Sequence, residues 1–271
     1  MSAPAAPRGV LVAGERVLLI DPKERRYLVR LQPGGRFQTH SGIIEHDEVI
    51  GGPAGGEVVA HRGEGEGRRF LVFRPTLSDL IVKMPRGAQV IYPKDLGAIL
   101  LAADLFPGAR VLEAGVGSGA LSMAALRAGC EVCGYEIRED FAERARANVA
   151  ALLGEDAPYR VESRDVYEGI AEEGFDRILL DLPEPWRVVP HAEDVLVPGG
   201  ILLAYLPTIN QTAELRAALD RSSFAAAETV EVLQRSWHVE GRSVRPDHRM
   251  VAHTGFLTSA RLVRRSAASP R

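Results

Sequence analysis

The feature that most constrains the fold is an apolar strand that runs into a glycine-rich turn at residues 111–120, with the sequence Val-Leu-Glu-Ala-Gly-Val-Gly-Ser-Gly-Ala. Glycines let a ligand approach the backbone closely, and the helix expected next, Ala120–Ala128, offers unpaired N–H groups at its first turn. A second strand, Glu131–Tyr135, is then followed by the acid Glu136. Together these elements predict a nucleotide-shaped pocket.

Length and composition favour an ordered soluble protein. The 271 residues are 46% hydrophobic and 25% charged, which is enough for one large domain or two unequal ones. No apolar run approaches the roughly 20 residues of a membrane helix. Residues 1–8 are rich in proline and alanine and lack the apolar core of a signal peptide, so we expect a frayed, disordered tail and a cytoplasmic protein.

The first part of the chain, residues 9–74, has the pattern of a small β-rich domain. Short apolar runs alternate with turn residues, as in a small barrel or sandwich. The expected strands are 17–20, 27–31, 58–60 and 70–73. The glycine-rich segment 63–67 is interpreted as a hairpin loop, and residues 75–93 as a linker.

From residue 94 to 271 the pattern changes to strands that alternate with helices. Expected helices are 95–105, 120–128, 140–153 and 213–219, and expected strands are 110–113, 131–135, 159–162, 177–180 and 200–205. Such alternation predicts an α/β fold with a Rossmann-like, doubly wound parallel sheet. Two later strands, around 229–233 and 254–260, fit an antiparallel edge.

Acidic residues at the strand ends favour one class of cofactor. The turn spacing also fits a dinucleotide fingerprint, but Glu113 would repel a pyrophosphate and attract an ammonium group. Glu136 can accept hydrogen bonds from a ribose diol. An ammonium and a ribose bound at opposite ends describe S-adenosyl-L-methionine. Asp165 could accept from the adenine amino group, or could simply cap a helix.

An acid and two prolines follow the strand Arg177–Leu180, in the sequence Asp-Leu-Pro-Glu-Pro-Trp at 181–186. This position in a doubly wound sheet faces the transferred group. The segment is reminiscent of the Asn-Pro-Pro-Tyr loop of enzymes that methylate exocyclic amines, although Asp181-Leu182-Pro183 departs from it. A loop with a helix-capping acid is the alternative.

Taken together, these motifs resemble the tRNA (adenine-N1)-methyltransferases, which modify the T-loop adenosine at tRNA nucleotide 58. The resemblance spans nearly the whole chain. The matching segments are 37–42, 84–86, 92–95, 111–119, 181–186, 205–208 and 253–257.

The resemblance implies an N-terminal β domain joined to a class I methyltransferase domain, assembled as a homotetramer. It implies that Asp181 lies beside both the methyl donor and the target base, and that Tyr92 lines the base pocket. Substrate and cofactor would be tRNA and S-adenosylmethionine. The implied cofactor contacts are Glu113, Gly115, Val116, Gly117, Ser118, Gly119, Ala120, Leu121, Glu136, Asp165 and Asp181.

Other residues with functional potential have ordinary structural alternatives. Cys130 and Cys133 lack the second ligand pair of a zinc site, so we expect two buried thiols and no metal. Tyr205 and Trp186 could stack on a base or belong to the core, and His40, His46 and His253 are of similar status. Although the net charge is −3, arginines that could contact phosphates gather late in the chain, at 235, 242, 245, 249, 261, 264 and 265.

Two other functions remain open from the sequence. A nicotinamide-dependent oxidoreductase would share the glycine turn and Glu136, but it leaves Glu113 and Asp181 without a role. A non-catalytic tRNA-binding subunit would be expected to have lost its cofactor motif, whereas here the glycines and both acids are intact.

Overall fold

The computed structural model describes residues 9–63, 67–84 and 89–264, and the chain divides into two compact units, Met1–Met84 and Pro85–Arg271. The expected N-terminal tail, the centre of the 63–67 loop, part of the 84–86 motif and Arg265 lie outside the described residues.

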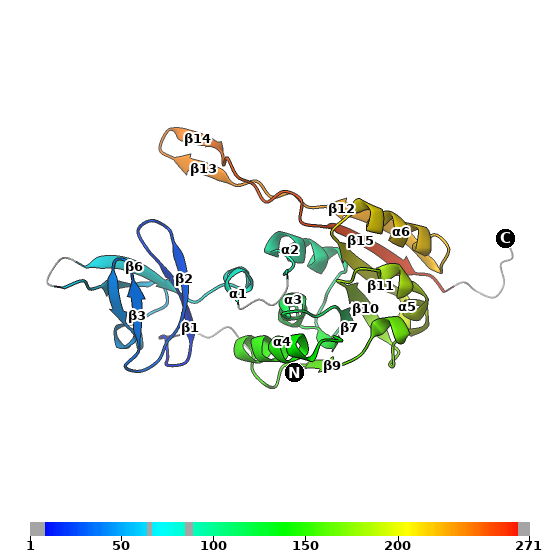
Figure 1. Ribbon diagram of the computed structural model, residues 1–271, viewed down its shortest axis with the longest axis horizontal. Coiled ribbons are helices and arrows are strands. Elements are labelled where there is room, and N and C mark those ends of the chain that lie inside the picture. The colour runs from blue at the N-terminus through cyan, green and yellow to red at the C-terminus, as the bar shows by residue number, and fades with distance from the viewer. Residues whose placement is uncertain (1–8, 64–66, 85–88, 265–271) are drawn as a thin grey trace. The chain divides into compact units, whose positions relative to one another are not determined.

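The first unit consists of strands and one α-helix (Figure 1). Its elements are β1 (Arg16–Ile20), β2 (Arg26–Arg30), β3 (Arg36–Thr39), β4 (Gly42–Glu45), the 3₁₀ turn η1 (His46–Glu48), β5 (Gly56–Ala60), β6 (Arg68–Phe73) and α1 (Leu77–Lys83). Four strands form an antiparallel sheet in the order β2-β1-β6-β5, while β3 and β4 pair as a separate hairpin. The β-rich character predicted for this region is therefore present.

Alternating side chains build the core of the first unit. Val17 and Leu19 on β1 and Phe70 and Val72 on β6 are all buried, as expected for strands with one face against a core. Helix α1 lies within the segment interpreted as a linker and was not predicted. Its start has a sequence signal that we missed, a capping box in which Thr76 and Asp79 each accept a hydrogen bond from the other's backbone N–H.

The second unit contains the strands and helices of a doubly wound fold. Its elements are α2 (Pro93–Ala102), β7 (Arg110–Ala114), α3 (Ala120–Arg127), β8 (Glu131–Tyr135), α4 (Glu139–Leu153), β9 (Tyr159–Glu162), η2 (Val166–Glu168), β10 (Phe175–Leu180), η3 (Pro185–Arg187), α5 (Val189–Val195), β11 (Leu196–Leu206), α6 (Ile209–Leu219), β12 (Phe224–Glu231), β13 (Trp237–Glu240), β14 (Ser243–Pro246) and β15 (Phe256–Leu262). Of these, α5 and the β13–β14 pair were not predicted.

The central sheet has seven strands in the order β12-β15-β11-β10-β7-β8-β9. Strands β11, β10, β7, β8 and β9 run parallel, and β15 and β12 add an antiparallel edge, which confirms both expectations. After β7 the chain builds outward through β8 and β9 and then returns to the other side of β7 with β10. The order therefore reverses between β7 and β10, which is where such sheets bind ligands at their carboxyl ends.

Helices cover both faces of this sheet (Figure 1). On one face Ala142 and Ala145 of α4 pack with Val116 and Val161. On the other face α5 and α6 contribute to a larger core built on β7, β10 and β11. Because apolar groups are buried on both faces, most residues of the central strands are hydrophobic.

A two-stranded arm, β13–β14, projects between β12 and β15 (Figure 1). Trp237, Val239 and Val244 on the arm are 59%, 70% and 60% exposed. Cys130 and Cys133 are buried free thiols, as predicted. None of the helices in the described part of the chain is long and apolar enough to cross a membrane.

Candidate active site

The glycine turn lies against the end of β10. Gly115 has φ +84°, and a Cβ added there would lie 2.1 Å from the carbonyl oxygen of Asp181. Any side chain at this position would therefore clash with the neighbouring strand end. Gly119, at φ +81°, caps α3, and the side chain of Ser118 is buried with no partner for its Oγ among the described residues. At this turn the backbone therefore lies very close to the end of β10, and the Ser118 hydroxyl has no hydrogen-bond partner among the described residues.

Glu113, on β7, is a carboxylate inside the protein. It is 1% exposed, and Ser122 Oγ on α3 donates to its Oε2 at 2.5 Å. The hydroxyl of Tyr159 lies 3.1 Å from Ser122 Oγ. Burial raises the pKa of Glu113 to about 8, and the charge of Asp181 adds to the rise. No lysine, arginine or histidine in the described part of the chain forms an ion pair with Glu113.

Asp181 follows β10 and faces the same pocket. Burial raises the pKa of Asp181 to about 7. The pocket is lined by Gln89, Val90, Ile91, Glu113, Gly115, Val116, Gly117, Ser118, Ala120, Leu121 and Asp181. Most of the residues that the sequence assigned to the cofactor therefore come together around two carboxylates at the switch point of the sheet.

Glu136 is held in place at the end of β8. The N–H of Gly117 donates to Glu136 Oε2 at 3.1 Å, and the N–H of Arg138 donates to Oε1 at 3.0 Å. Each oxygen keeps a lone pair for a further donor. This carboxylate is thus fixed directly to the glycine turn.

Asp165 does not line the pocket of Glu113 and Asp181. Its Oδ1 accepts from the N–H of Tyr167 at 2.9 Å and caps η2, and it borders a separate recess with Ser163 and Arg164. Asp165 therefore caps a helix, as one of its two predicted roles stated.

Tyr92 is the residue before α2, and its carbonyl oxygen accepts from the N–H groups of Asp95 and Leu96. Tyr205, on β11, donates from its hydroxyl to the carbonyl oxygen of Thr254 at 2.6 Å. Burial raises the pKa of Tyr205 to about 12, with nearby Asp95, Asp181 and Tyr92 adding to the rise. Tyr205 thus lies near both Asp181 and Tyr92.

Known proteins resemble this chain over nearly its full length. A family profile described as "tRNA methyltransferase complex GCD14 subunit" matches residues 70–247, and one described as "TrmI-like N-terminal" matches residues 9–59. The "tRNA (adenine(58)-N(1))-methyltransferase TrmI" of Thermus thermophilus is 38% identical over 254 residues, which cover 90% of this chain and 96% of that relative. The chain belongs to the tRNA (adenine-N1)-methyltransferase family.

Solved structures related to this family share its architecture. The "tRNA (m1A58) methyltransferase TrmI" of Aquifex aeolicus aligns with TM-score 0.82 and 32% identity, covering 95% of this chain and 100% of that one. A "SAM-dependent O-methyltransferase" of Thermotoga maritima aligns with TM-score 0.88 and 34% identity, covering 95% and 96%. The Rossmann-like methyltransferase fold predicted from the sequence is therefore confirmed.

Some residues adjacent to those of the site were missed or left without a role by sequence reasoning. Ile137, directly after Glu136, is 66% exposed although it is large and apolar. Ser122, which donates to Glu113, gives no signal in the sequence beyond its place on α3. Trp186, in contrast, packs against the core of the second unit. This agrees with the alternative in which Trp186 belongs to the core instead of stacking on a base.

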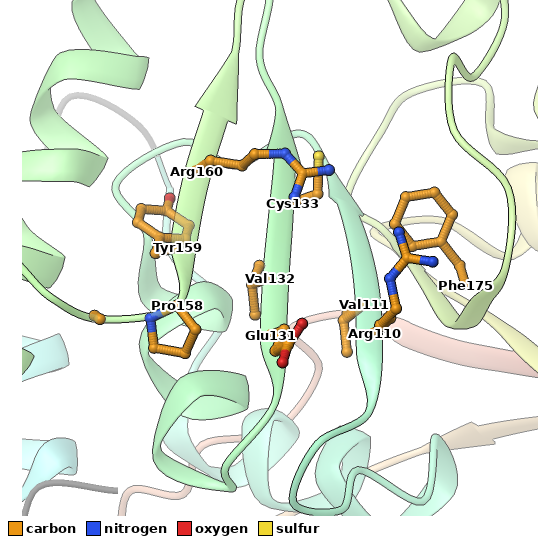
Figure 2. Close-up of a pocket in the computed structure, with 10 residues that line it drawn as sticks. Arg110, Val111, Glu131, Val132, Cys133, Pro158, Tyr159, Arg160 and Phe175 are labelled. Carbon is orange, nitrogen blue, oxygen red and sulfur yellow. The ribbon is translucent and has the colours of Figure 1, made fainter. Parts of the chain in front are cut away.

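A second pocket lies at the opposite end of the strands (Figure 2). It extends over the amino ends of β7, β8 and β9 and is bordered by Arg110, Glu131 and Arg160. Arg110 pairs with Glu172 at 3.2 Å and donates to the carbonyl oxygens of Glu173 and Gly174. Ligands of doubly wound sheets bind at the carboxyl ends, so this recess is not the methyltransferase site.

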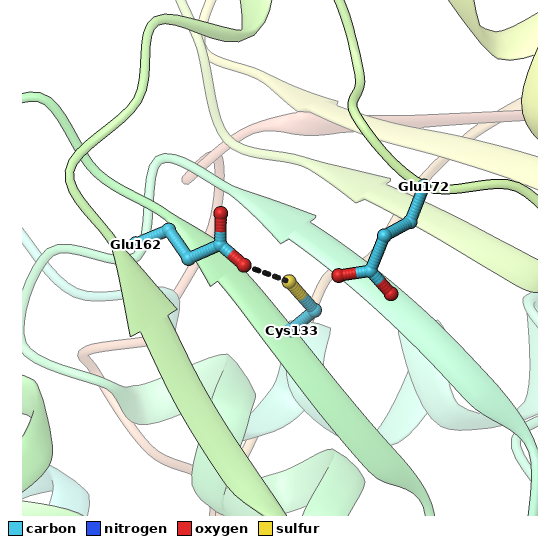
Figure 3. Close-up of side chains that lie close together, drawn as sticks. All are labelled: Cys133, Glu162 and Glu172. Atoms are coloured by element: carbon cyan, nitrogen blue, oxygen red, sulfur yellow. Dashed lines mark hydrogen bonds between the residues drawn. The ribbon is translucent and has the colours of Figure 1, made fainter.

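Three possible metal ligands, Cys133, Glu162 and Glu172, meet on one face of the sheet (Figure 3). Arginines already neutralise both acids, since Arg164 Nε lies 2.8 Å from Glu162 and Arg160 pairs with Glu172. Burial raises the pKa of the Cys133 thiol to about 11, so it is not a thiolate at neutral pH. This cluster is an ion-pair network beside a buried thiol.

The candidate phosphate contacts are mostly on or beside the arm. Arg235, Arg242, Arg245 and Arg249 are exposed there, and Arg261 and Arg264 are exposed on or after β15. The histidines behave as structural groups: His46 is buried, His40 contacts Arg25, and His253 bridges Glu231 and the carbonyl oxygen of Pro207.

Proposed function

We propose that this protein transfers the methyl group of S-adenosylmethionine to N1 of adenosine 58 in the T-loop of tRNA. One observation carries the proposal, in a chain of this family. A buried carboxylate, Glu113, and a partly exposed one, Asp181, border a glycine turn at the switch point of the sheet, and among the described residues neither has a cationic side-chain partner. A cationic cofactor with an ammonium and a sulfonium would supply the missing positive charge.

The residues around the turn fit S-adenosylmethionine in its separate parts. Glu113 would bind the ammonium, and the spare lone pairs of Glu136 would accept from the ribose hydroxyls. The buried Ser118 Oγ, which lacks a partner among the described residues, is available to the amino-acid end. The exposed Ile137, directly after Glu136, would cover one face of the adenine. Asp165 uses Oδ1 for its capping bond, and its other oxygen would accept from the adenine amino group. The cofactor supplies an electrophilic methyl group.

Asp181 is proposed as the residue that orients the target base. Adenine N1 already carries a lone pair, so no strong base is needed before it attacks the methyl group. Alignment of the two reactants can contribute roughly 7–11 kcal/mol. Positive charge develops on the purine, and a carboxylate that accepts from the N6 amino group stabilises it. Asp181 can also hold a proton from N6, because burial has raised its pKa to about 7.

Tyr92 and Tyr205 are proposed to receive the extruded base. A T-loop adenine is stacked and paired within the tRNA elbow, so it must leave the stack to reach the pocket. Stacking on an aromatic side chain is worth about 1–3 kcal/mol per base and offsets part of that cost. Tyr205 is near both Asp181 and Tyr92, which supports a shared base pocket.

We also propose a homotetramer and a cytoplasmic location, where tRNA is modified. The exposed apolar side chains of the arm support an assembly between copies of the chain, because apolar patches of this kind commonly mark interfaces. Neither an oxidoreductase nor a non-catalytic subunit accounts for Glu113 and Asp181 at the glycine turn.

The test is methylation of an unmodified tRNA transcript with methyl-labelled S-adenosylmethionine, followed by digestion and mass spectrometry of the nucleosides. Labelled 1-methyladenosine mapped to nucleotide 58 is the expected result, and a transcript with guanosine at 58 is the control. Cofactor binding without any methylated nucleoside would contradict the proposed substrate.

A further inference from the structure

Side chains from the first turn of α2 and from the segment before β15 form a closed set of hydrogen bonds. Lys94 Nζ donates to Asp95 Oδ1 at 2.7 Å and to Thr254 Oγ1 at 2.6 Å, and Thr254 Oγ1 donates in turn to Asp95 Oδ2 at 2.6 Å. The side chains of Lys94 and Asp95 are only 3% and 0% exposed. A buried ion pair is costly unless its remaining donors and acceptors are satisfied, and here Thr254 completes the set. We call these three residues the knot.

The knot joins both legs of the arm to one helix end. Lys94 Nζ also donates to the carbonyl oxygen of Val232 at 2.6 Å, and Val232 lies just after β12. Thr254 lies on the returning leg, just before β15. One ammonium group therefore ties the departing and returning strands of the arm to the first turn of α2.

The same residues determine where the two tyrosines lie. Thr254 accepts the Tyr205 hydroxyl bond through its carbonyl oxygen, and a Cβ added at the next residue, Gly255, would lie 2.5 Å from the Tyr205 ring. Tyr92 leads into α2, and its carbonyl oxygen accepts from the N–H of Asp95 at 2.9 Å. The Tyr205 side chain therefore contacts the knot directly, whereas Tyr92 is joined to it through its backbone carbonyl.

We infer that Lys94, Asp95 and Thr254 are positioning residues that hold Tyr92 and Tyr205 in the arrangement that receives the target base. This inference rests on the proposed tRNA methylation. None of the three touches cofactor or base; they act through the two tyrosines. Breaking the knot frees the helix end from the root of the arm, so the base would bind in several poses and few would be aligned for transfer.

Thr254→Val is the most informative variant, because it keeps side-chain shape and charge while removing the hydroxyl that bridges Lys94 and Asp95. Thr254→Ser keeps the hydroxyl and should restore wild-type behaviour. The matched control is Thr229→Val, which removes a comparable hydroxyl pair with Thr258 at 2.9 Å between β12 and β15, away from the knot. Melting temperature and oligomeric state are recorded for each full-length variant.

For Thr254→Val we expect kcat for tRNA methylation to fall at least about tenfold, equivalent to about 1.4 kcal/mol. The KM for tRNA should change little, since phosphate contacts elsewhere dominate tRNA affinity. Cofactor affinity, measured by calorimetry, should stay within about twofold because Glu113 and Glu136 are untouched. Thr229→Val should lose a similar amount of melting temperature while keeping its kcat.

Equal losses of kcat in Thr254→Val and Thr229→Val, or unchanged kcat in Thr254→Val, would overturn the positioning role. Crystal structures of wild type and Thr254→Val give a readout independent of activity: displaced Tyr92 and Tyr205 rings support the inference, and superimposable rings overturn it. If wild-type protein binds S-adenosylmethionine but methylates no tRNA, the proposed function fails, and the ring positions still decide whether the knot orders this pocket.

Discussion

The two acidic clusters of the central sheet differ in how their charges are balanced. At the carboxyl ends of the strands, Glu113 is buried and Asp181 is partly exposed, and neither forms an ion pair with a side chain in the described part of the chain. On the face of β8 and β9, Glu162 and Glu172 are paired with arginines. The charges of Glu162 and Glu172 are already balanced by arginines. Acids withdrawn from water without such a partner favour the binding of a cationic ligand. The difference identifies the ligand site more directly than pocket size does.

The largest effect is expected from Asp181→Asn. This substitution removes the negative charge beside the target base and the carboxylate able to hold its proton, so kcat should fall about 10²–10⁴-fold. Single-turnover methylation of tRNA measures the step directly. S-adenosylmethionine binding should persist, which separates this variant from one that fails to fold. Near-normal turnover would show that Asp181 has no part in methyl transfer.

Glu113→Gln tests the first cluster's role in binding. The variant keeps the side chain's size but loses its charge, so S-adenosylmethionine affinity should fall by about 1.5–3 kcal/mol, the value of a hydrogen bond to a charged group. Calorimetry gives the affinity. Glu162→Gln is the matched control in the second cluster and should bind the cofactor as wild type does; equal losses in both variants would erase the proposed contrast.

Cofactor binding should also depend on pH. Burial raises the pKa of Glu113 from its usual value of 4.5 to about 8. Between these two pH values the folded protein without cofactor keeps the Glu113 proton, whereas the unfolded chain has released it. The contribution of this group to the free energy of unfolding is therefore fully present below the usual glutamate pKa of 4.5, and it is lost as pH rises through about 8. Cofactor affinity follows the opposite course, because the ammonium needs the ionised carboxylate.

Affinity should therefore rise between about pH 6.5 and pH 7.5, by at most about tenfold per pH unit, and decline above about pH 8, where the α-amino group of the cofactor loses its own proton. Calorimetric titrations of S-adenosylmethionine across this range make the comparison. In Glu113→Gln the slope should flatten. An affinity that already falls between about pH 6.5 and pH 7.5 in wild type would contradict the assignment of Glu113 to a cationic group.

The smallest effect is expected at the second cluster. Glu172→Gln removes a half-exposed partner of Arg110 and Arg160, so the free energy of unfolding should fall by only about 0–1 kcal/mol. Denaturant unfolding measures this change. Addition of zinc or of a chelator should leave the transition of wild type unchanged; a zinc-dependent rise would instead turn the cluster into a metal site.

The sequence predicted the parts of the site that depend on local order along the chain. Glu113, the glycines and Glu136 each stand at a strand end, and a parallel sheet brings strand ends together, so their meeting followed from the fold class. Asp181 was predictable for the same reason.

Features that depend on contacts distant in sequence could not be predicted. Lys94 and Thr254 lie far apart along the chain, and nothing in the Tyr-Pro-Lys-Asp segment indicates a buried ammonium. The arm was missed because each of its strands is only four residues long, too short for alternation of apolar and polar residues to stand out. The capping box of α1, in contrast, was readable at Thr76 and Asp79 and was overlooked within a supposed linker.

A crystal structure with S-adenosylmethionine bound would test the central claim most directly. The cofactor should place its ammonium within hydrogen-bond distance of Glu113, its ribose on Glu136 and its methyl group toward Asp181. Binding in the amino-end pocket of Figure 2, or in the glycine-turn pocket with Glu113 contacting no part of the cofactor, would contradict the account.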